Sequence, residues 1–348
     1  MRIAYVTETY PPELNGVSLT VQRTETFLRR SGCDVELIRP RQGGEAPRED
    51  DDVWLTPGMA IPMYPDLRFG MPAKRKLVAR WQRNPPHLVH VATEGPLGWS
   101  AVQAARRLGI ATTSDFRTNF HHYSRYYRLG WMEGLVTRYL RSFHNATLRT
   151  FVPTAEMRDV LAGEGFGNLE VVGRGVDTHL FNPQRRSTLL RDMWGADESS
   201  PVLLYVGRLA AEKNVDLVFE AMQRVKERSP DAKLVVVGDG PQRAELESYY
   251  RDAIFMGRRQ DEDLAEIYAS ADIFLFPSRT DTFGNVVLEA MASGLLVVAY
   301  DTGAAREHLY TQGSGLVAPH SEQAFVSAAC ILARYLSRYR PLRERARS

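Results

Sequence analysis

Short apolar runs alternate with longer amphipathic stretches along the whole chain. The runs are apolar almost throughout, as are strands buried on both faces of a sheet. Between them, apolar residues recur at helical spacing, for example from about 16 to 30. The segments predicted as strands are 2–8, 34–40, 88–93, 111–116, 149–154, 169–172, 201–206, 233–237, 253–256, 271–277, 295–301 and 316–318. Strands that alternate with helices predict an α/β fold with a mostly parallel sheet in each half of the chain.

The stretch 278–294 carries the most informative chemistry. It is S-R-T-D-T-F-G-N-V-V-L-E-A-M-A-S-G, and it follows the predicted strand 271–277. The apolar spacing turns helical from Asn285, so the loop before it lies at the carboxyl end of a strand, where open α/β sheets bind ligands. The first helical residues, Asn285, Val286 and Val287, offer free backbone N–H groups to an anion such as a phosphate.

Two carboxylates bracket this helix start. Asp281 is in the loop, and Glu289 comes just over one turn into the predicted helix. Backbone amides flanked by acids suit a ligand that carries both phosphates and sugar hydroxyls. An ordinary helix entry with surface acids is the alternative interpretation.

The segment D-T-F-G-N-V-V-L-E-A-M-A-S-G resembles the E-x7-E signature of family 4 retaining glycosyltransferases. Asp281 stands where that family usually has its first Glu, and Glu289 stands at the second. The resemblance covers most of the chain and implies the GT-B architecture, which is two Rossmann-like domains facing a cleft. It also implies that the first acid contacts the hydroxyls of the transferred sugar and that the second holds the ribose of the nucleotide.

Other donor-binding candidates follow strands elsewhere in the chain. Arg208 and Lys213 are five residues apart at a strand exit in G-R-L-A-A-E-K-N, and the resemblance implies that they grip the donor diphosphate as catalytic cations. Gly16 lies at a strand-to-helix turn and is a candidate to face a diphosphate, or else a plain turn glycine. Gly257 and Arg258 resemble the segment that abuts the nucleobase.

The predicted strand 111–116 is followed by R-T-N-F-H-H-Y, where the sequence departs from the family. Many members have a His-Thr pair here, and that His lies near the transferred sugar. The matching position is Arg117. His121 is a candidate catalytic substitute one turn further on, and a loop histidine without a special role is the other interpretation.

The domain boundary is predicted near residue 180. The segment G-R-G-V-D at 173–177 resembles the interdomain connection of the family. An acceptor-side domain would then cover 1–180, and a nucleotide-sugar-binding domain would cover 181–348. Family members usually end with a helix that crosses back to the first domain, and residues near 322–338 are predicted to supply part of it.

The amino-acid composition excludes several classes of protein. The chain has 348 residues, 44% hydrophobic and 25% charged, which is typical of a globular protein with enough length for two domains. A net charge of only +2 argues against a nucleic-acid partner. Cys33 and Cys330 cannot form a disulfide framework, and no apolar run reaches the roughly 18 residues of a spanning helix. We therefore expect a cytoplasmic protein.

Two charged segments allow more than one interpretation. The acidic loop Glu49–Asp52 is expected to be solvated, because adjacent like charges favour exposure, although such a cluster also suits a metal. A basic amphipathic helix is predicted from Lys74 onward. Such a helix lies either in solvent or on an anionic membrane surface, so the expected cytoplasmic protein would be membrane-associated in the second case.

The predicted function is transfer of a hexose from a UDP- or GDP-linked sugar to a lipid or saccharide acceptor, with retention at the anomeric carbon. Fixed cations and helix amides are expected to replace a metal, and no cofactor is expected beyond the nucleotide-diphospho sugar substrate. The pattern is most similar to bacterial enzymes that glycosylate lipids, including mannosyl and sulfoquinovosyl transferases. A non-catalytic sugar-nucleotide-binding protein is the alternative. A dehydrogenase is disfavoured, because G-D-G at 238–240 continues to Arg243 where the dinucleotide fingerprint needs a third glycine.

Overall fold

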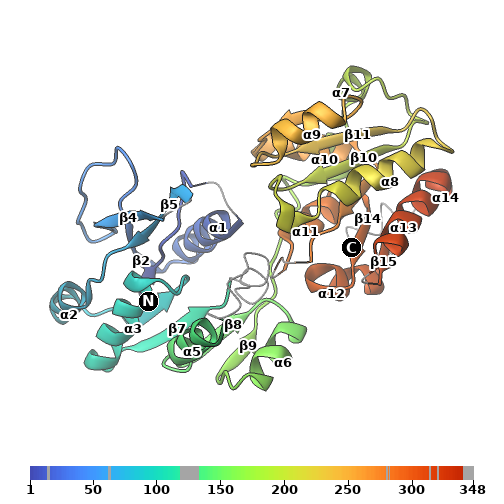
Figure 1. The fold of residues 1–348 in the computed structure, drawn as a ribbon. Helices are drawn as coiled ribbons and strands as arrows, with labels where there is room; N and C mark the ends of the chain where they lie inside the picture. The colour runs from blue at the N-terminus through green and yellow to red at the C-terminus, as the bar shows by residue number, and fades with distance from the viewer. Residues whose placement is uncertain are drawn as a thin grey trace. The chain divides into compact units, whose positions relative to one another are not determined.

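The computed structural model describes residues 1–13, 16–61, 64–117, 133–279, 281, 283–312, 315–319 and 321–339. The chain divides into two compact units, Met1–Gly173 and Arg174–Ser348. Figure 1 draws unit 1 from blue to green and unit 2 from green to red. The division falls a little before the predicted boundary at 180. Each unit is described by itself.

Unit 1 contains a parallel sheet with the strand order β3-β2-β1-β6-β7-β8-β9 over its described residues. Its strands are β1 (Arg2–Val6), β2 (Asp34–Pro40), β3 (Val53–Thr56), β6 (Leu88–Val91), β7 (Ala111–Asp115), β8 (Arg149–Val152) and β9 (Leu169–Val171). Its helices are α1 (Gly16–Arg30), α2 (Lys74–Arg83), α3 (Pro96–Leu108), α5 (Glu133–His144) and α6 (Ala155–Gly163). Because β1 pairs with both β2 and β6, the order reverses between β1 and β6.

The alternation of side chains along β1 shows why this strand is central. Ala4 and Val6 enter the cluster packed under α2 and α3, while Tyr5 enters the cluster on the α1 side. Each of the three residues is fully buried. A strand covered on both faces must be apolar throughout, as the sequence predicted.

The sequence analysis predicted no strand between 41 and 70, whereas the structure has three. β3 extends the sheet by pairing with β2, and β4 (Gly58–Ile61) forms an antiparallel hairpin with β5 (Tyr64–Gly70). These short strands lack the long apolar runs of the central ones. In the acidic loop before β3, the Asp50 carboxylate accepts from the backbone N–H of Asp52 and Val53, at 3.0 and 2.7 Å.

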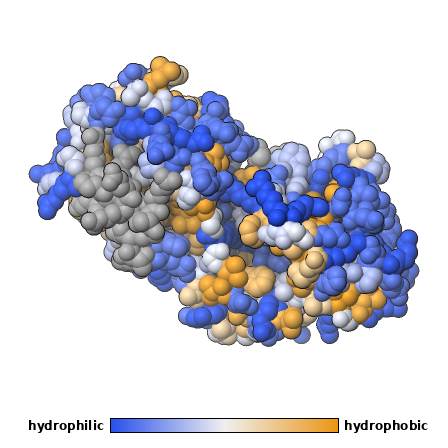
Figure 2. Space-filling model, turned by 180° about the vertical axis from the view of Figure 1, so that it is seen from behind, coloured by the Kyte–Doolittle hydropathy of each residue, from blue (hydrophilic) through white to orange (hydrophobic). Residues whose placement is uncertain are grey.

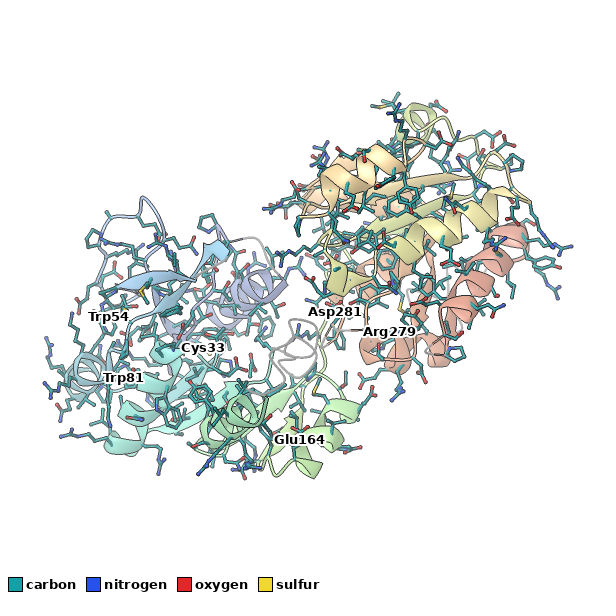
Figure 3. The ribbon with its side chains drawn as sticks, in the orientation of Figure 1. Cys33, Trp54, Trp81, Glu164, Arg279 and Asp281 are labelled. Carbon is teal, nitrogen blue, oxygen red and sulfur yellow. The ribbon has the colours of Figure 1, made fainter. Side chains whose placement is uncertain are left out.

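Helix α2 presents its apolar face to the interior of unit 1. Leu77, Val78 and Trp81 are buried in the same cluster as Trp54 of β3. Figure 3 labels the two tryptophans within this unit. The apolar side that a membrane-surface helix would insert into lipid is therefore occupied by the core, and only the basic side faces outward.

Unit 2 contains a second parallel sheet, with the strand order β12-β11-β10-β13-β14-β15 over the residues described. Its strands are β10 (Val202–Val206), β11 (Lys233–Val237), β12 (Ile254–Gly257), β13 (Ile273–Phe276), β14 (Leu296–Tyr300) and β15 (Gly315–Ala318). Its helices are α7 (Thr188–Met193), α8 (Asp216–Lys226), α9 (Arg243–Tyr249), α10 (Asp261–Ser270), α11 (Asn285–Ala292), α12 (Gly303–Gln312), α13 (Glu322–Arg334) and α14 (Leu336–Tyr339). Two 3-10 turns are Pro183–Arg185 and Ala211–Lys213.

Both faces of this sheet are covered by helices. Leu204 and Val206 of β10 belong to the cluster that includes α10 and α11, whereas Leu203 and Tyr205 belong to the cluster that includes α8 and α13. Helix α13 packs against α8, β14 and β15, so the described part of the segment expected to supply a crossover helix is embedded in unit 2. Figure 1 shows α13 beside β15, with α14 continuing beyond it.

The expected α/β class is confirmed by these two sheets. Across the described ranges, no helix is both long enough and apolar enough to span a bilayer. On the face drawn in Figure 2, hydrophilic residues predominate and hydrophobic ones form separate groups between them.

Candidate active site

The loops after β10 and β13 meet at the point where the strand order of unit 2 reverses. β10 and β13 are hydrogen-bonded neighbours, although two strands separate them in the chain. In open parallel sheets this is where ligands bind, beyond the carboxyl ends of the strands. The predicted motifs with Arg208 and Lys213 follow β10, and the motif with Asp281 and Glu289 follows β13.

Lys213 and Asp281 contact each other across these two loops. The Lys213 Nζ donates to both carboxylate oxygens of Asp281, at 2.8 Å each. The two side chains are 17% and 28% exposed, so ligand atoms can reach them. The predicted diphosphate cation and the predicted sugar-binding carboxylate therefore form one charge pair in the ligand-free protein. Figure 3 marks Asp281 in the segment between β13 and α11.

Glycines bring the loops after β10 and β11 into backbone contact. A Cβ on Gly238, whose φ is +138°, would lie 1.8 Å from the carbonyl oxygen of Gly207. A Cβ on Gly240 would lie 2.2 Å from the carbonyl oxygen of Leu209, whose N–H donates to Asp239 O at 3.0 Å. The G-D-G sequence therefore serves loop packing, and its glycines hold the segment with Arg208 and Lys213 in place.

Arg208 lies at the exit of β10 with its side chain 43% exposed. Its Nη1 is 3.7 Å from Glu212 Oε1, and the Glu212 side chain is almost fully buried. The Tyr205 hydroxyl donates to the backbone oxygen of Arg208 at 3.0 Å. Burial raises the pKa of Tyr205, and the nearby charges of Asp281 and Glu212 raise it further. Tyr205 is therefore a neutral donor that fixes the start of the loop.

Helix α11 begins without an acid of its own. Gly284 precedes it with a φ of +87°, and the first turn contains no acidic side chain. The Val287 N–H donates to Gly284 O at 2.9 Å, while Asn285 and Val286 remain half-exposed. A helix start of this kind is electrically suited to an anion, as the sequence predicted.

Two arginines that the sequence analysis did not single out hold the loop before α11. The Arg174 Nη1 lies 3.5 Å from Asn285 Oδ1, and its guanidinium carbon lies 5.7 Å from the centroid of the Phe283 ring. Arg279 donates to the Tyr300 hydroxyl at 2.9 Å and lies over the same ring at 4.5 Å. Arg174 belongs to G-R-G-V-D, which the sequence marked only as a connection.

Glu289 is oriented by a buried tyrosine. The Tyr268 hydroxyl donates to Glu289 Oε2 at 3.2 Å. Burial raises the pKa of Tyr268, and the adjacent Glu289 carboxylate adds to the effect. Glu289 itself is half-buried on the first turns of α11. A carboxylate held in this way is a fixed acceptor for hydroxyl groups.

Gly257 ends the outer strand β12, and Arg258 follows it. Gly257 has a φ of +66°, and its carbonyl oxygen accepts from Gly238 N–H at 2.9 Å. Arg258 is exposed. Two strand spacings separate β12 from β10 in the sheet, which is about 10 Å. That separation suits a ligand whose base and phosphates are bound at different strand ends.

Unit 1 has its own strand-order reversal, between β1 and β6. Gly16 begins α1, and a Cβ there would meet nothing within 4 Å. Glu8 follows β1, and its carboxylate accepts from the N–H groups of Gly70, Leu97 and Gly98, at 3.0, 2.8 and 3.3 Å. Burial raises the pKa of Glu8 to about 7, although these hydrogen bonds oppose the shift.

Arg117, at the family's His position, is part of a buried ion pair. Its Nε donates to Asp115 Oδ2 at 2.8 Å, and His90 Nε2 lies 3.3 Å from the same oxygen. Burial opposes the charge of Asp115, but Arg117 and His90 hold the pKa of this carboxyl below its usual range. His121 lies outside the described residues, so its catalytic role stays a prediction.

The fold defines an α/β protein of two units, each with a parallel sheet whose strand order reverses once. Residues 14–180 match the family model described as Glycosyltransferase Family 4, and residues 200–334 match the model described as Glycosyl transferases group 1. The chain is 35% identical over 327 residues to a GDP-mannose-dependent alpha-mannosyltransferase of Mycobacterium tuberculosis, covering 92% of this chain and 85% of that one. This chain belongs to the family 4 glycosyltransferases, and the resemblance in the sequence is confirmed.

Two further comparisons extend this result. The alpha-monoglucosyldiacylglycerol synthase of Streptococcus pneumoniae is 26% identical over 313 residues, covering 86% of this chain and 71% of that one. A sucrose-phosphate synthase from Thermosynechococcus elongatus has a TM-score of 0.79 at 18% identity, covering 99% of this chain and 93% of that one. The structural likeness confirms the expected GT-B fold.

Proposed function

We propose that this glycosyltransferase moves a hexose from a nucleoside-diphosphate sugar to a lipid or saccharide acceptor and retains the anomeric configuration. The observation that carries the proposal is the contact between Lys213 and Asp281 at the strand-order reversal of unit 2. It places a cation suited to a diphosphate beside a carboxylate suited to sugar hydroxyls. A sugar joined directly to a phosphate needs these two kinds of group next to each other.

The role proposed for the cations is stabilisation of the leaving group. The bond between the anomeric carbon and the phosphate oxygen breaks, and the diphosphate gains negative charge. Once the donor is bound, Arg208, Lys213 and the N–H groups at the start of α11 would face the departing diphosphate, so they would stabilise this charge more in the transition state than in the ground state. These groups would make a metal unnecessary.

Retention requires attack on the face that the leaving group occupies. The acceptor oxygen bonds to the anomeric carbon while its proton passes to the departing phosphate oxygen. Asp281 would orient the sugar hydroxyls, and Glu289 would accept from the ribose. We propose these catalytic roles for Arg208, Lys213 and Asp281. Besides Glu289, the residues proposed to bind the donor are Gly16, Gly257, Arg258, Asn285, Val286 and Val287.

GDP-mannose is the donor we propose to test first. The mycobacterial relative is described as dependent on GDP-mannose, while the streptococcal one is described as a glucosyldiacylglycerol synthase. The first description favours a GDP-linked hexose, and the second favours a lipid acceptor; a UDP-linked hexose is the other donor to test. The outward basic side of α2 suits electrostatic contact with an anionic membrane, without insertion of its buried apolar side.

The test is a transfer assay with purified protein. GDP-mannose and UDP-glucose would each be incubated with diacylglycerol, with a glycosyl lipid and with a free saccharide. We expect one donor to yield an α-linked product, identified by NMR of the anomeric proton. A protein that binds these donors but neither transfers nor slowly hydrolyses them would be a sugar-nucleotide-binding protein. A β-linked product from an α-linked donor would contradict retention.

A further inference from the structure

Arg174 lies at the start of α11 but has no role in the proposed mechanism. It is the first residue of unit 2 and is half-buried. Its guanidinium reaches the loop before α11, 3.5 Å from Asn285 Oδ1 and 5.7 Å from the centroid of the Phe283 ring. The side chain therefore lies at the helix start proposed for phosphate binding, although it comes from a segment 111 residues earlier in the chain.

The position of this arginine opposes the dipole of the helix. The amino end of a helix carries a partial positive charge, so acids are stabilising there and cations are not. Helix α11 has no acid in its first turn, and it is preceded by Gly284, which has no side chain to accept from the N–H groups. Bringing a guanidinium to this end adds positive charge to positive charge. An anionic ligand bound between the guanidinium and the helix end would attract both positive charges and so offset their repulsion.

The contacts of Arg174 with Asn285 and Phe283 are of a kind that a phosphate can displace. An amide oxygen at 3.5 Å is a long hydrogen-bond acceptor, and the face of a phenylalanine ring is a weak partner for a cation. Lys213, by contrast, is held by a full carboxylate at 2.8 Å. A guanidinium offers parallel N–H groups that match the oxygens of a phosphate, so the exchange would gain charge-assisted bonds.

We propose that Arg174 is a further donor-binding residue, which contacts the phosphate attached to the sugar at the start of α11. This rests on the proposed function, because it takes a nucleoside-diphosphate sugar as the ligand. It gives the diphosphate a third cation, independent of Arg208 and Lys213. The structural alternative is that Arg174 only orients Asn285 and Phe283.

Calorimetry with GDP, GMP, UDP and UMP separates these roles. We expect Arg174→Gln to weaken binding of the preferred diphosphate at least about tenfold, because a charge-assisted bond is lost. Binding of the matching monophosphate should change less than about twofold, since the outer phosphate is absent. Arg174→Lys should recover part of the loss. The matched control is Arg334→Gln, because Arg334 also lies over a ring, that of Tyr335, but on α13.

The outcomes are distinguishable. Equal losses for diphosphate and monophosphate would assign Arg174 a purely structural role and overturn the inference. The inference would also be overturned if Arg174→Gln bound the diphosphate as tightly as the wild type while Lys213→Ala bound it more weakly. If Arg174→Gln has a lowered melting temperature, the comparison is made with Arg174→Lys, which keeps the charge but loses the parallel N–H groups. A wild-type protein that binds none of the four nucleotides would overturn both this inference and the proposed function.

Discussion

Lys213 and Asp281 neutralise each other in the ligand-free protein, so a donor must replace one charge contact with another. The pair is partly exposed, and such pairs contribute little net stability. Lys213 therefore loses little free energy when it leaves Asp281 to bind a diphosphate. The same exchange frees Asp281 for the sugar hydroxyls, so both ends of the donor would be recognised in one rearrangement.

The cation role predicts a large loss on removing the ammonium group. Lys213→Ala should cost on the order of 2–4 kcal/mol of transition-state stabilisation, as for one preorganised donor. That corresponds to a fall of about 30- to 1,000-fold in kcat/KM. Steady-state kinetics with the preferred donor would measure it, with Lys226→Ala on the outer helix α8 as control. A loss below roughly threefold in a folded variant would rule out the role.

Substitutions of Glu289 and Asp281 should have different effects on nucleotide binding and on turnover. Glu289→Gln should weaken the bare nucleoside diphosphate, because a carboxylate that accepts from hydroxyls loses a charge-assisted bond. Asp281→Asn should leave that affinity unchanged or slightly tighter, since it releases Lys213 from its carboxylate, yet it should lower turnover of the full donor. Calorimetry and transfer assays give both numbers. Equal weakening of the bare nucleotide by both variants would refute the placement of the sugar at Asp281.

The raised pKa of Glu8 predicts that the free energy of unfolding depends on pH. Its pKa is raised from 4.5 to about 7 in the folded protein, so the folded state keeps a proton that the unfolded state releases. Stability from Glu8 is thus fully present below about pH 4.5 and is lost as the pH rises through about 7. The loss is on the order of 3 kcal/mol. Urea unfolding at pH 5 and pH 8 should show a steeper decline in wild type than in Glu8→Gln, and parallel declines would contradict the assignment.

At the scale of single residues, the sequence identified candidate side chains better than it identified the residues that they contact. It placed Lys213 and Asp281 at strand exits, but nothing along the chain shows that the loops after β10 and β13 bring them together. It marked Arg117 as a departure from the family, yet the contact of His90 with the Asp115 carboxylate that pairs with Arg117 depends on β6 lying beside β7 in the sheet. Arg174 was missed because its contacts are more than a hundred positions away.

At the scale of elements, the loops after β10 and β11 depend on glycine. Gly238→Ala should be strongly destabilising, because φ is +138° and a Cβ would lie 1.8 Å from Gly207 O. We expect about 2–4 kcal/mol lost in urea unfolding, since backbone must move. Gly134→Ala in α5 is the matched control, because its Cβ would meet nothing within 4 Å, and it should be neutral or slightly stabilising. Equal effects of the two changes would argue against a packing role for Gly238.

Elements with strong periodicity were predicted well. β2, β11 and the start of α11 at Asn285 lie where the sequence placed them, because buried parallel strands and helices with an apolar face leave clear apolar patterns. The hairpin β4–β5 and the edge strand β3 were missed. Their stability depends on pairing with a neighbour rather than on an apolar run, and pairing is not visible in one sequence.

At the scale of the whole molecule, repetition was the most reliable signal. Two successive sets of alternating strands and helices predicted two parallel sheets, and both are present. The sequence did not predict the strand orders. These orders bring the informative loops of unit 2 together at β10 and β13, and they separate these loops from β12, whose end is predicted to abut the nucleobase. A nucleotide sugar would therefore be bound by several loops of one sheet, with its charge met by side chains and amides.

This distribution of cations leads to a prediction for the complete reaction. If Arg208, Lys213 and the N–H groups of α11 supply the positive charge where the diphosphate departs, as proposed, transfer should proceed without a divalent cation. Activity of the full chain should be unchanged within about twofold after dialysis against EDTA, measured with the preferred donor and acceptor at constant ionic strength. Rising salt, in contrast, should weaken donor binding, because fixed charges in a partly exposed site are screened. If EDTA abolishes transfer and manganese restores it, the leaving group is stabilised by a metal, and the cations have a supporting role only.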